Sequence, residues 1–113
     1  MKEETQAVLL RMFIGEKDKC DGQTLYEYIV QYLARNHYAG VTVLRGIAGF
    51  GKASKVHTAN ILELSTDEPI IIEIVDTQEK IEEFKAAYDT WKVSGSALIT
   101  EEKIKVIQYG HKK

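Results

Sequence analysis

The sequence predicts an α+β domain of the ferredoxin-like class, in which two helices cover one face of a four-stranded antiparallel sheet. Two segments have apolar residues at the spacing of an amphipathic helix, and strand-like runs precede, separate and follow them in the order β-α-β-β-α-β. The length of 113 residues fits one domain, because a domain usually needs about 100 to 150 residues to build a core. Residues 1–113 are therefore expected to form a single domain.

The first half of the chain predicts a strand, a loop, a helix and a second strand. Residues 8–14 alternate as a strand that is mostly apolar on both faces. Residues 15–22 are polar and bounded by glycines, which is typical of a loop. Residues 41–45 are short and β-branched, so they indicate a strand. The helix between them is expected from residue 24 to about residue 36, where one apolar stripe is formed by Leu25, Tyr28, Ile29, Tyr32 and Leu33.

The second half predicts further strands. Pro69 opens a strongly apolar strand over residues 70–75, where proline is tolerated at the first position because no ladder donor is needed there. A short strand is expected before it, over residues 59–64. Residues 103–109 give the final strand, which is followed by a basic tail.

A second helix is expected from residue 77 to about residue 92. Asp76 and Glu79 resemble a capping box in which Asp replaces the usual Ser or Thr. The aromatic residues on the two helix stripes are expected in the core rather than on a base-stacking platform; they are Tyr28, Tyr32, Phe84, Tyr88 and Trp91.

The sheet face without helices is expected to be too apolar to remain in water. Strand alternation places on it Leu9, Phe13, Leu44, Ile71 and Val75, together with Arg11 and Glu73. We therefore expect a homo-oligomer, in which Arg11 and Glu73 would need each other because an unpaired buried charge is costly. The alternative is a shift of one residue in strand phase, which would exchange the two faces.

Composition and charge exclude several classes of protein. The net charge of -2 disfavours a general nucleic-acid binder, and no nucleic acid is expected as a partner. No apolar run approaches the ~20 residues that cross a bilayer, and the first residues do not form a signal peptide. Cys20 is the single cysteine, so it cannot form an internal disulfide or a zinc cluster. A cytoplasmic location is expected.

The most informative stretch is the glycine-rich turn after the second strand. Gly46, Gly49 and Gly51 would leave backbone N–H groups open to an anion, and Lys52, Lys55 and His57 follow within reach of a bound phosphate. Ala53 stands where a Walker A motif has Ser or Thr, and no helical stripe follows as in a dinucleotide fingerprint. The alternative is a bulged strand end with a solvated basic loop.

No catalytic or metal-binding constellation is apparent within one chain. His37, His57 and His111 are scattered, without a ligand spacing such as i, i+4. A serine or cysteine nucleophile with a base and an orienting acid has no signature here, so an enzyme is not expected. Cys20 is expected to be a spectator thiol, unless nearby Lys17 or Lys19 lowers its pKa.

Two segments closely resemble the uncharacterised PII-like family, which is more distantly related to the nitrogen regulatory protein PII. They are the Leu-Arg-Gly-x-x-Gly-Phe-Gly run at residues 44–51 and the Ile-Glu-Ile-Val run at residues 72–75. The similarity extends from the first strand to Val106. The resemblance implies a ferredoxin-like homotrimer with adenine nucleotides in the clefts between subunits, and a ligand-responsive loop after the second strand that engages a partner.

The resemblance also assigns candidate nucleotide-binding residues. PII proteins contact the nucleotide through a threonine in the second strand and through the Gly-Phe-Gly turn, which correspond here to Thr42, Gly49, Phe50 and Gly51. A basic residue directly after that turn contacts the phosphate in PII proteins and corresponds to Lys52. Lys55 and His57 join these candidates because they follow the glycine-rich turn closely enough to reach a phosphate. This chain has one more residue between Thr42 and Gly49 than PII proteins have, so the alignment of Thr42 with the PII threonine is open by one position. Residues 93–98, at the place of a second PII phosphate loop, contain no cation, which favours a mono- or diphosphate over a triphosphate.

The leading hypothesis is a non-catalytic PII-like signalling protein that binds AMP, ADP or ATP, with Mg²⁺ as an accompanying ion. Relatives are often encoded near fluoride or other ion transporters, so a membrane transporter is a candidate partner. The alternative is a divalent-cation-binding trimer of the cation-tolerance type, in which symmetry brings together three copies of His57 or His37. A nucleotide hydrolase is a third option, which lacks an identified general base.

Overall fold

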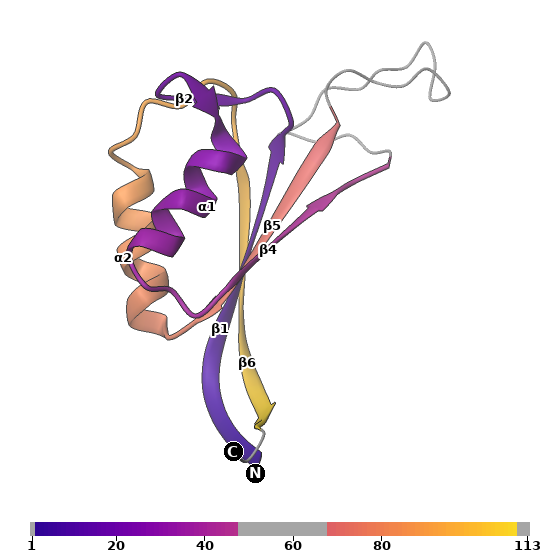
Figure 1. The fold of residues 1–113 in the computed structure, drawn as a ribbon, viewed down its shortest axis with the longest axis vertical. Coiled ribbons are helices and arrows are strands. Elements are labelled where there is room, and N and C mark those ends of the chain that lie inside the picture. Colours follow the sequence, from indigo (N-terminus) through magenta and orange to yellow (C-terminus); the bar gives the residue numbers. More distant parts are fainter. Residues whose placement is uncertain (1, 48–67, 111–113) are drawn as a thin grey trace.

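The fold is a twisted antiparallel sheet with two long helices on one of its faces (Figure 1). This computed structural model describes residues 2–47 and 68–110. The elements in chain order are β1 (Lys2–Gly15), β2 (Lys19–Cys20), β3 (Gln23–Thr24), α1 (Leu25–Arg35), β4 (Val41–Arg45), β5 (Pro69–Asp76), α2 (Gln78–Tyr88) and β6 (Leu98–Tyr109). The sheet order is β4-β5-β1-β6 and all neighbours are antiparallel. The predicted α+β class is confirmed, and the arrangement is compatible with a ferredoxin-like fold.

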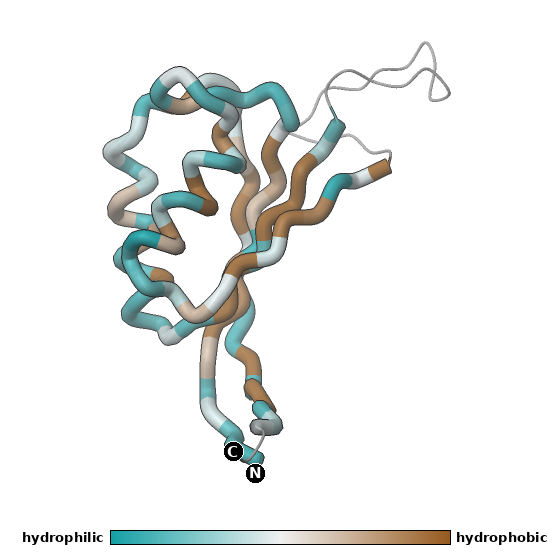
Figure 2. The backbone as a smooth tube through the Cα atoms, viewed as in Figure 1, coloured by the Kyte–Doolittle hydropathy of each residue, from teal (hydrophilic) through white to brown (hydrophobic). Residues whose placement is uncertain are grey.

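The core lies between the sheet and the two helices. Alternate residues of the central strands are buried there: Val8, Leu10, Met12 and Ile14 from β1, and Ile70, Ile72 and Ile74 from β5. The helices add Leu25, Ile29, Leu33, Ile81 and Phe84. Figure 2 shows the most hydrophobic segments along the strands and the hydrophilic ones on the outer turns of the helices. The predicted strand phase is therefore correct.

The two strands that hold the chain ends are longer than their side-chain pattern predicts. β1 begins at Lys2 rather than at residue 8, and β6 begins at Leu98 rather than at residue 103. They pair with each other from Lys2 to Phe13, whereas β5 pairs with β1 only from Val8 onward. Residues 2–7 and 104–109 therefore form a two-stranded arm that extends beyond the helices (Figure 1). Backbone pairing, rather than alternation of side chains, sets these bounds.

The polar segment after β1 is not wholly a loop. Lys19 and Cys20 pair with Gln23 and Thr24 in a small hairpin, which the sequence analysis missed. The turn residues Asp21 and Gly22 have φ of 54° and 80°, the left-handed conformation that a two-residue hairpin turn needs. The Asp-Gly pair is the sequence signal for such a turn, but the short flanking strands lack an apolar alternation.

The second helix starts and stops at other residues than predicted. Thr77, not Asp76, is the N-cap residue, and its Oγ1 accepts a hydrogen bond from the Lys80 backbone N–H at 3.2 Å. The Asp76 carboxylate instead accepts hydrogen bonds of 2.8 Å from the backbone N–H groups of Thr77 and Ala39. The helix ends at Tyr88 rather than near residue 92. The capping box predicted from Asp76 and Glu79 is therefore wrong, although the helix itself is confirmed.

Candidate functional site

The sheet face opposite the helices is organised in rows that run across the strands. Residues paired in an antiparallel sheet lie side by side on the same face. Phe13 pairs with Ile71 and with Leu98, and Ile71 pairs with Leu44, which gives one wholly apolar row. The helices do not cover this face (Figure 1). The apolar residues predicted for it are confirmed there.

A polar row lies directly beside the apolar one. Thr42 of β4 pairs with Glu73 of β5, which pairs with Arg11 of β1, which in turn pairs with Thr100 of β6. The row therefore crosses all four strands of the sheet. Arg11 and Glu73 were predicted on this face from strand alternation, whereas Thr100 was not, because the register between distant strands has no local signal.

Arg11 and Glu73 form the ion pair that the sequence analysis expected. Arg11 Nε donates a hydrogen bond to Glu73 Oε2 at 2.9 Å. Their side chains are 34% and 30% exposed, so in a single chain water still reaches both charges. A pair in such surroundings is worth only about 0–1 kcal/mol. Its importance grows if a partner covers the face and removes that water.

Of the predicted nucleotide-binding residues, the structure describes one. Thr42 lies exposed on the edge strand β4, with its side chain on the helix-free face beside Glu73. The others, Gly49, Phe50, Gly51, Lys52, Lys55 and His57, lie outside the described residues, as does the short strand predicted over residues 59–64. The grouping of these residues around a ligand therefore stays a prediction.

The first glycine of the predicted turn has a structural role. The Gly46 N–H donates to the Pro69 carbonyl at 2.8 Å, so it is not open to an anion as expected. A Cβ on Gly46 would lie 2.8 Å from Pro69 Cγ, so a side chain there would collide with the proline ring. Gly46 thus packs β4 against β5.

An ion-pair cluster connects the two ends of the segment that joins β4 to β5. Arg45 Nη2 donates to Glu16 Oε2 at 2.6 Å, and Arg45 Nε lies 3.0 Å from Glu68 Oε1. The Glu16 backbone N–H also donates to the Glu68 carbonyl at 2.8 Å. Residues 45 and 68 are thereby held close to the end of β1. None of these three charged residues was predicted to have a role.

The loop after α2 is hydrogen-bonded to the β2–β3 hairpin. Cys20 and Val93 form a β-bridge, the Ser94 N–H donates to the Lys19 carbonyl at 3.0 Å, and the Lys19 N–H donates to Ser94 Oγ at 2.9 Å. Gly95 has a φ of +90° and lies against the Asp18 carboxylate. The segment of residues 93–98, which the resemblance matched to a second PII phosphate loop, therefore lies beside an acidic side chain.

Replacement of Gly95 by alanine is expected to destabilise the domain. A left-handed residue with a Cβ costs roughly 1–2 kcal/mol, and the new Cβ would lie 2.5 Å from Asp18 Oδ1. Chemical unfolding of the variant should show a loss of at least that size. Gly40→Ala is the matched control, because nothing lies within 4 Å of the Cβ that it would add. Equal stability of the two variants would contradict the strain at Gly95.

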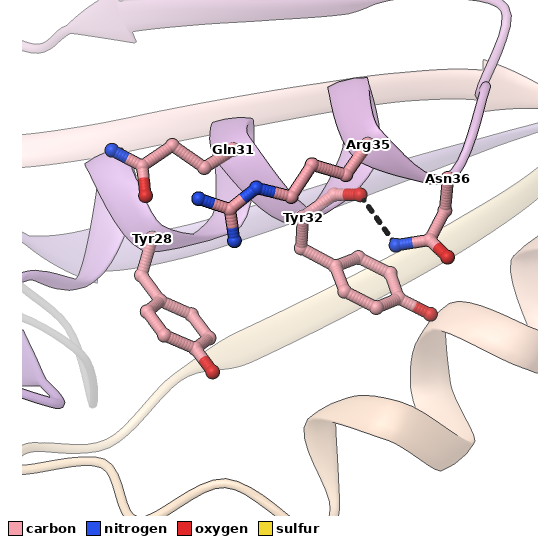
Figure 3. A pocket seen from close by; sticks show the side chains of 5 residues that line it. All are labelled: Tyr28, Gln31, Tyr32, Arg35 and Asn36. Carbon is pink, nitrogen blue, oxygen red and sulfur yellow. Dashed lines mark hydrogen bonds between the residues drawn. The ribbon is translucent and has the colours of Figure 1, made fainter.

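A small pocket lies on the helix side of the molecule, along α1. It has a volume of about 100 Å³ and is lined by Tyr28, Gln31, Tyr32, Arg35 and Asn36 (Figure 3). Asn36 Nδ2 donates to the Tyr32 carbonyl at 2.8 Å, which fixes the last turn of the helix. The volume is well below the roughly 300–1,000 Å³ of pockets that enclose drug-sized ligands. This pocket therefore does not provide room for a nucleotide.

The aromatic residues of the two helix stripes pack together but are not all buried. Phe84 is fully buried, whereas Tyr28, Tyr32, Tyr88 and Trp91 are partly exposed around it. Trp91 makes edge contacts with Tyr28 and Tyr32 at centroid distances of 4.6 and 5.3 Å. The predicted core role holds fully for Phe84 alone. The others pack around Phe84 at the surface between the helices, and of the predicted stripe only Trp91 lies beyond the end of α2.

Burial favours the neutral forms of Tyr38 and of Cys20. Burial raises the pKa of Tyr38 far above its usual value, with Tyr32 adding to the shift, and the Tyr38 hydroxyl donates to the Lys80 carbonyl at 2.9 Å. Burial also raises the pKa of the Cys20 thiol, and the negative charge of Asp21 adds to it. Lys17 and Lys19 therefore do not activate this thiol as a nucleophile.

Neither metal ligation nor membrane spanning is supported by the described part of the chain. Among residues 2–47 and 68–110, no three His, Cys, Asp or Glu side chains group closely enough to hold a metal ion. His37 is exposed at the end of α1 with a φ of 61°. Within the same residues, the helices have 11 residues each, too few and too polar for the ~20 that a bilayer requires.

Comparison with known proteins gives matches over nearly the whole chain. The family DUF190, described as "Uncharacterized ACR, COG1993", matches residues 7–106. A UPF0166 protein of Aquifex aeolicus is 33% identical over 99 residues, which cover 88% of this chain and 91% of the relative. A UPF0166 protein of Methanocaldococcus jannaschii is 35% identical over 97 residues, or 85% of this chain and 89% of the relative. The chain therefore belongs to the uncharacterised DUF190 family, whose members include the UPF0166 proteins.

Proposed function

We propose that this protein is a non-catalytic, cytoplasmic PII-like regulator, a homotrimer that binds an adenine nucleotide in the clefts between its subunits. The observation that carries this proposal is the place of Thr42. It lies on an edge strand, next to the apolar sheet face, a few residues before the Gly-Phe-Gly turn. A ligand that touches both Thr42 and that turn would therefore sit at the border of the face that a second copy would cover.

Association is supported by the apolar row on the helix-free face. Phe13, Ile71, Leu44 and Leu98 lie side by side without a covering helix. Complete burial of a fully exposed side chain of this kind stabilises by about 1.5–3 kcal/mol. The four side chains of the row each keep part of their surface exposed, so covering the row favours association by a fraction of that value for each. The proposed oligomer places this row, and the Arg11–Glu73 pair beside it, between subunits.

The phosphates of the nucleotide would be held by the residues after the glycine turn. Lys52, Lys55 and His57 supply the cations, and the turn supplies backbone N–H groups. The acidic Asp18 beside Gly95 disfavours a further phosphate at the loop after α2. We therefore propose AMP or ADP as better ligands than ATP, with Mg²⁺ only where a diphosphate or triphosphate requires it.

Signalling would follow from a difference between the free and bound states of the segment after β4. The Arg45 cluster fixes the two ends of that segment, so ligand binding would act on the residues between them. A partner that contacts only one state converts nucleotide binding into a change of affinity. An ion transporter of the membrane is the partner that we propose for this regulator.

Titration calorimetry of the purified protein with AMP, ADP, ATP and cyclic dinucleotides tests the proposal. Thr42→Val removes a hydroxyl at nearly constant volume and should weaken binding roughly three- to tenfold, the loss of one hydrogen bond of ~0.5–1.5 kcal/mol. Thr100→Val is the matched control, because it makes the same change at the other end of the polar row.

Three results would overturn parts of this proposal. Absence of heat with every nucleotide at millimolar concentration would remove nucleotide binding. Equal weakening by Thr42→Val and Thr100→Val would remove Thr42 from the site. If chromatography of the released ligand shows that bound nucleotide has been converted to one with fewer phosphates, the protein is not non-catalytic.

A further inference from the structure

The pocket along α1 combines aromatic walls with an exposed positive charge. Its lining residues are spaced by three and four positions along the helix and its C-cap, so they form one stripe: Tyr28, Gln31, Tyr32, Arg35 and Asn36. The rings of Tyr28 and Tyr32 point to one side, whereas the side chain of Arg35 extends back along the helix toward Gln31 (Figure 3). The hollow of about 100 Å³ is therefore bounded by two rings and by polar head groups.

Contacts with other aromatic residues hold the two tyrosine rings in place. Trp91, which follows α2, packs edge-on against Tyr28 and Tyr32 at 4.6 and 5.3 Å between ring centroids. Phe84 of the core contacts Tyr32 at a centroid distance of 6.1 Å. Because each ring has a packing partner, the aromatic wall of the pocket is formed before any ligand binds. A preformed wall lowers the entropy cost of binding.

Arg35 has no acidic partner among the described residues. The other two arginines of the chain, Arg11 and Arg45, each form an ion pair with a glutamate. Arg35 forms none within residues 2–47 and 68–110, and its neighbours one turn earlier, Gln31 and Tyr32, are a neutral amide and a tyrosine. The five N–H donors of its exposed guanidinium are therefore available to an anion from solution.

The end of α1 does not need the Arg35 guanidinium as a cap. A basic residue in the last turn of a helix often hydrogen-bonds the free carbonyl groups there. In this helix the carbonyls of Tyr32, Leu33 and Ala34 already accept backbone N–H groups from residues 36–38. Asn36 Nδ2 is a second donor to the Tyr32 carbonyl, at 2.8 Å. Capping therefore does not explain why a cation borders the pocket.

We propose that this pocket binds a small monocarboxylate, whose carboxylate pairs with Arg35 and whose apolar part lies against the rings of Tyr28 and Tyr32. The volume is below the ~150 Å³ of a cavity that accepts benzene, so a ligand of about four non-hydrogen atoms fits. A planar carboxylate accepts two parallel N–H bonds from one guanidinium, which also neutralises its single charge. A phosphate dianion would keep a negative charge beside this single cation.

This site is independent of the proposed nucleotide site. The pocket lies on the helix side of the molecule, whereas the side chain of Thr42 lies on the helix-free face of the sheet. An oligomer that covers the helix-free face would leave α1 accessible to a small ligand (Figure 1). The presence or absence of nucleotide binding therefore does not decide whether this pocket takes a carboxylate.

Titration of the isotope-labelled protein with sodium acetate, followed by two-dimensional NMR at neutral pH and constant ionic strength, tests the proposal. The N–H signals of Gln31, Arg35 and Asn36 should shift and saturate. The expected Kd is roughly 1–10 mM, because a ligand of about four non-hydrogen atoms gains little free energy in an open pocket. Acetamide is the matched neutral ligand, and it should bind at least about tenfold more weakly because it lacks the charge.

Two variants of Arg35 separate charge from geometry. Arg35→Gln removes the charge and should weaken acetate binding at least about tenfold. Arg35→Lys keeps the charge without the planar fork, and it should weaken binding by roughly three- to tenfold. Lys103→Gln is the matched control, because it removes one positive charge from an exposed position of β6 and should leave the Kd unchanged.

Four results would overturn the proposal. Shifts that grow without saturation would show that acetate has no site here. Equal binding of acetate and acetamide would remove Arg35 as the recognising group. Equal weakening by Arg35→Gln and Lys103→Gln would show that net charge, rather than the pocket, attracts the anion. Tighter binding of inorganic phosphate than of acetate would exclude a carboxylate pocket. The indole N–H signal of Trp91 reports whether each variant is folded, and Arg35→Lys alone decides if Arg35→Gln is not.

Discussion

Replacement of Glu73 by methionine should dissociate the oligomer while leaving the stability of the single chain nearly unchanged. In one chain, Arg11 and Glu73 are each about one-third exposed, so their pair contributes only about 0–1 kcal/mol. If a second copy covers the helix-free face, loss of Glu73 leaves the Arg11 charge buried without a partner, which costs about 3–5 kcal/mol. Sedimentation of the variant over a range of concentrations measures the dissociation of the oligomer, and chemical unfolding of the resulting monomer measures the stability of the single chain.

The double variant Arg11→Met/Glu73→Met distinguishes the effect of the unpaired charge on association from the effect of the altered side-chain shape. It replaces the ion pair by two apolar side chains of similar length, so association should return to the wild-type level or exceed it. Glu102→Met is the matched control, since it removes a carboxylate from the same face, where Glu102 pairs with Leu9. A Glu73→Met protein that sediments as the wild type would show that this face is not covered in solution.

Replacement of Phe84 by alanine should have the largest effect on the stability of the chain itself. Phe84 is fully buried at the centre of the core and contacts the rings of Tyr32, Tyr88 and Trp91. Loss of such a ring from a core typically costs about 3–5 kcal/mol, because the cavity that remains does not collapse completely. For a domain with only ~5–15 kcal/mol of total stability, the variant would be close to unfolding.

Thermal unfolding followed by circular dichroism measures this loss. Glu83→Ala is the matched control, because Glu83 is the preceding residue of α2 and is exposed. The control should change the free energy of unfolding by no more than about 0.5 kcal/mol. A similar melting temperature for both variants would contradict the central place of Phe84 in the core.

The faces of the central strands could be predicted because burial imposes a strict alternation on them. β1 and β5 each present apolar residues to the core at every second position, so Leu10 and Ile72 identify one face while Arg11 and Glu73 identify the other. The start of β6 could not be predicted in this way. Glu101 and Glu102 have no apolar alternation, and they belong to a strand only because Leu10 and Leu9 lie opposite them.

The candidate site was predictable where it depends on local sequence and not where it depends on register. Thr42 was chosen through the resemblance of the second strand and the Gly-Phe-Gly turn to PII proteins, and its role in binding stays a prediction. Its position in one row with Glu73, Arg11 and Thr100 follows from the pairing of strands that are far apart in the chain. The same holds for Gly46, whose N–H was expected to face an anion and instead pairs with Pro69, because no local pattern indicates which strand lies beside it.

The burial of Cys20 gives this protein a built-in reporter of local opening. Cys20 is the single thiol of the chain, it is only 3% exposed, and it lies where the β2–β3 hairpin meets Val93. An alkylating reagent can reach the sulfur only when this contact opens, so the rate of alkylation relative to that of a free thiol measures the free energy of that opening. Unlabelled protein is therefore sufficient to compare how firmly this corner is held in different ligand or assembly states.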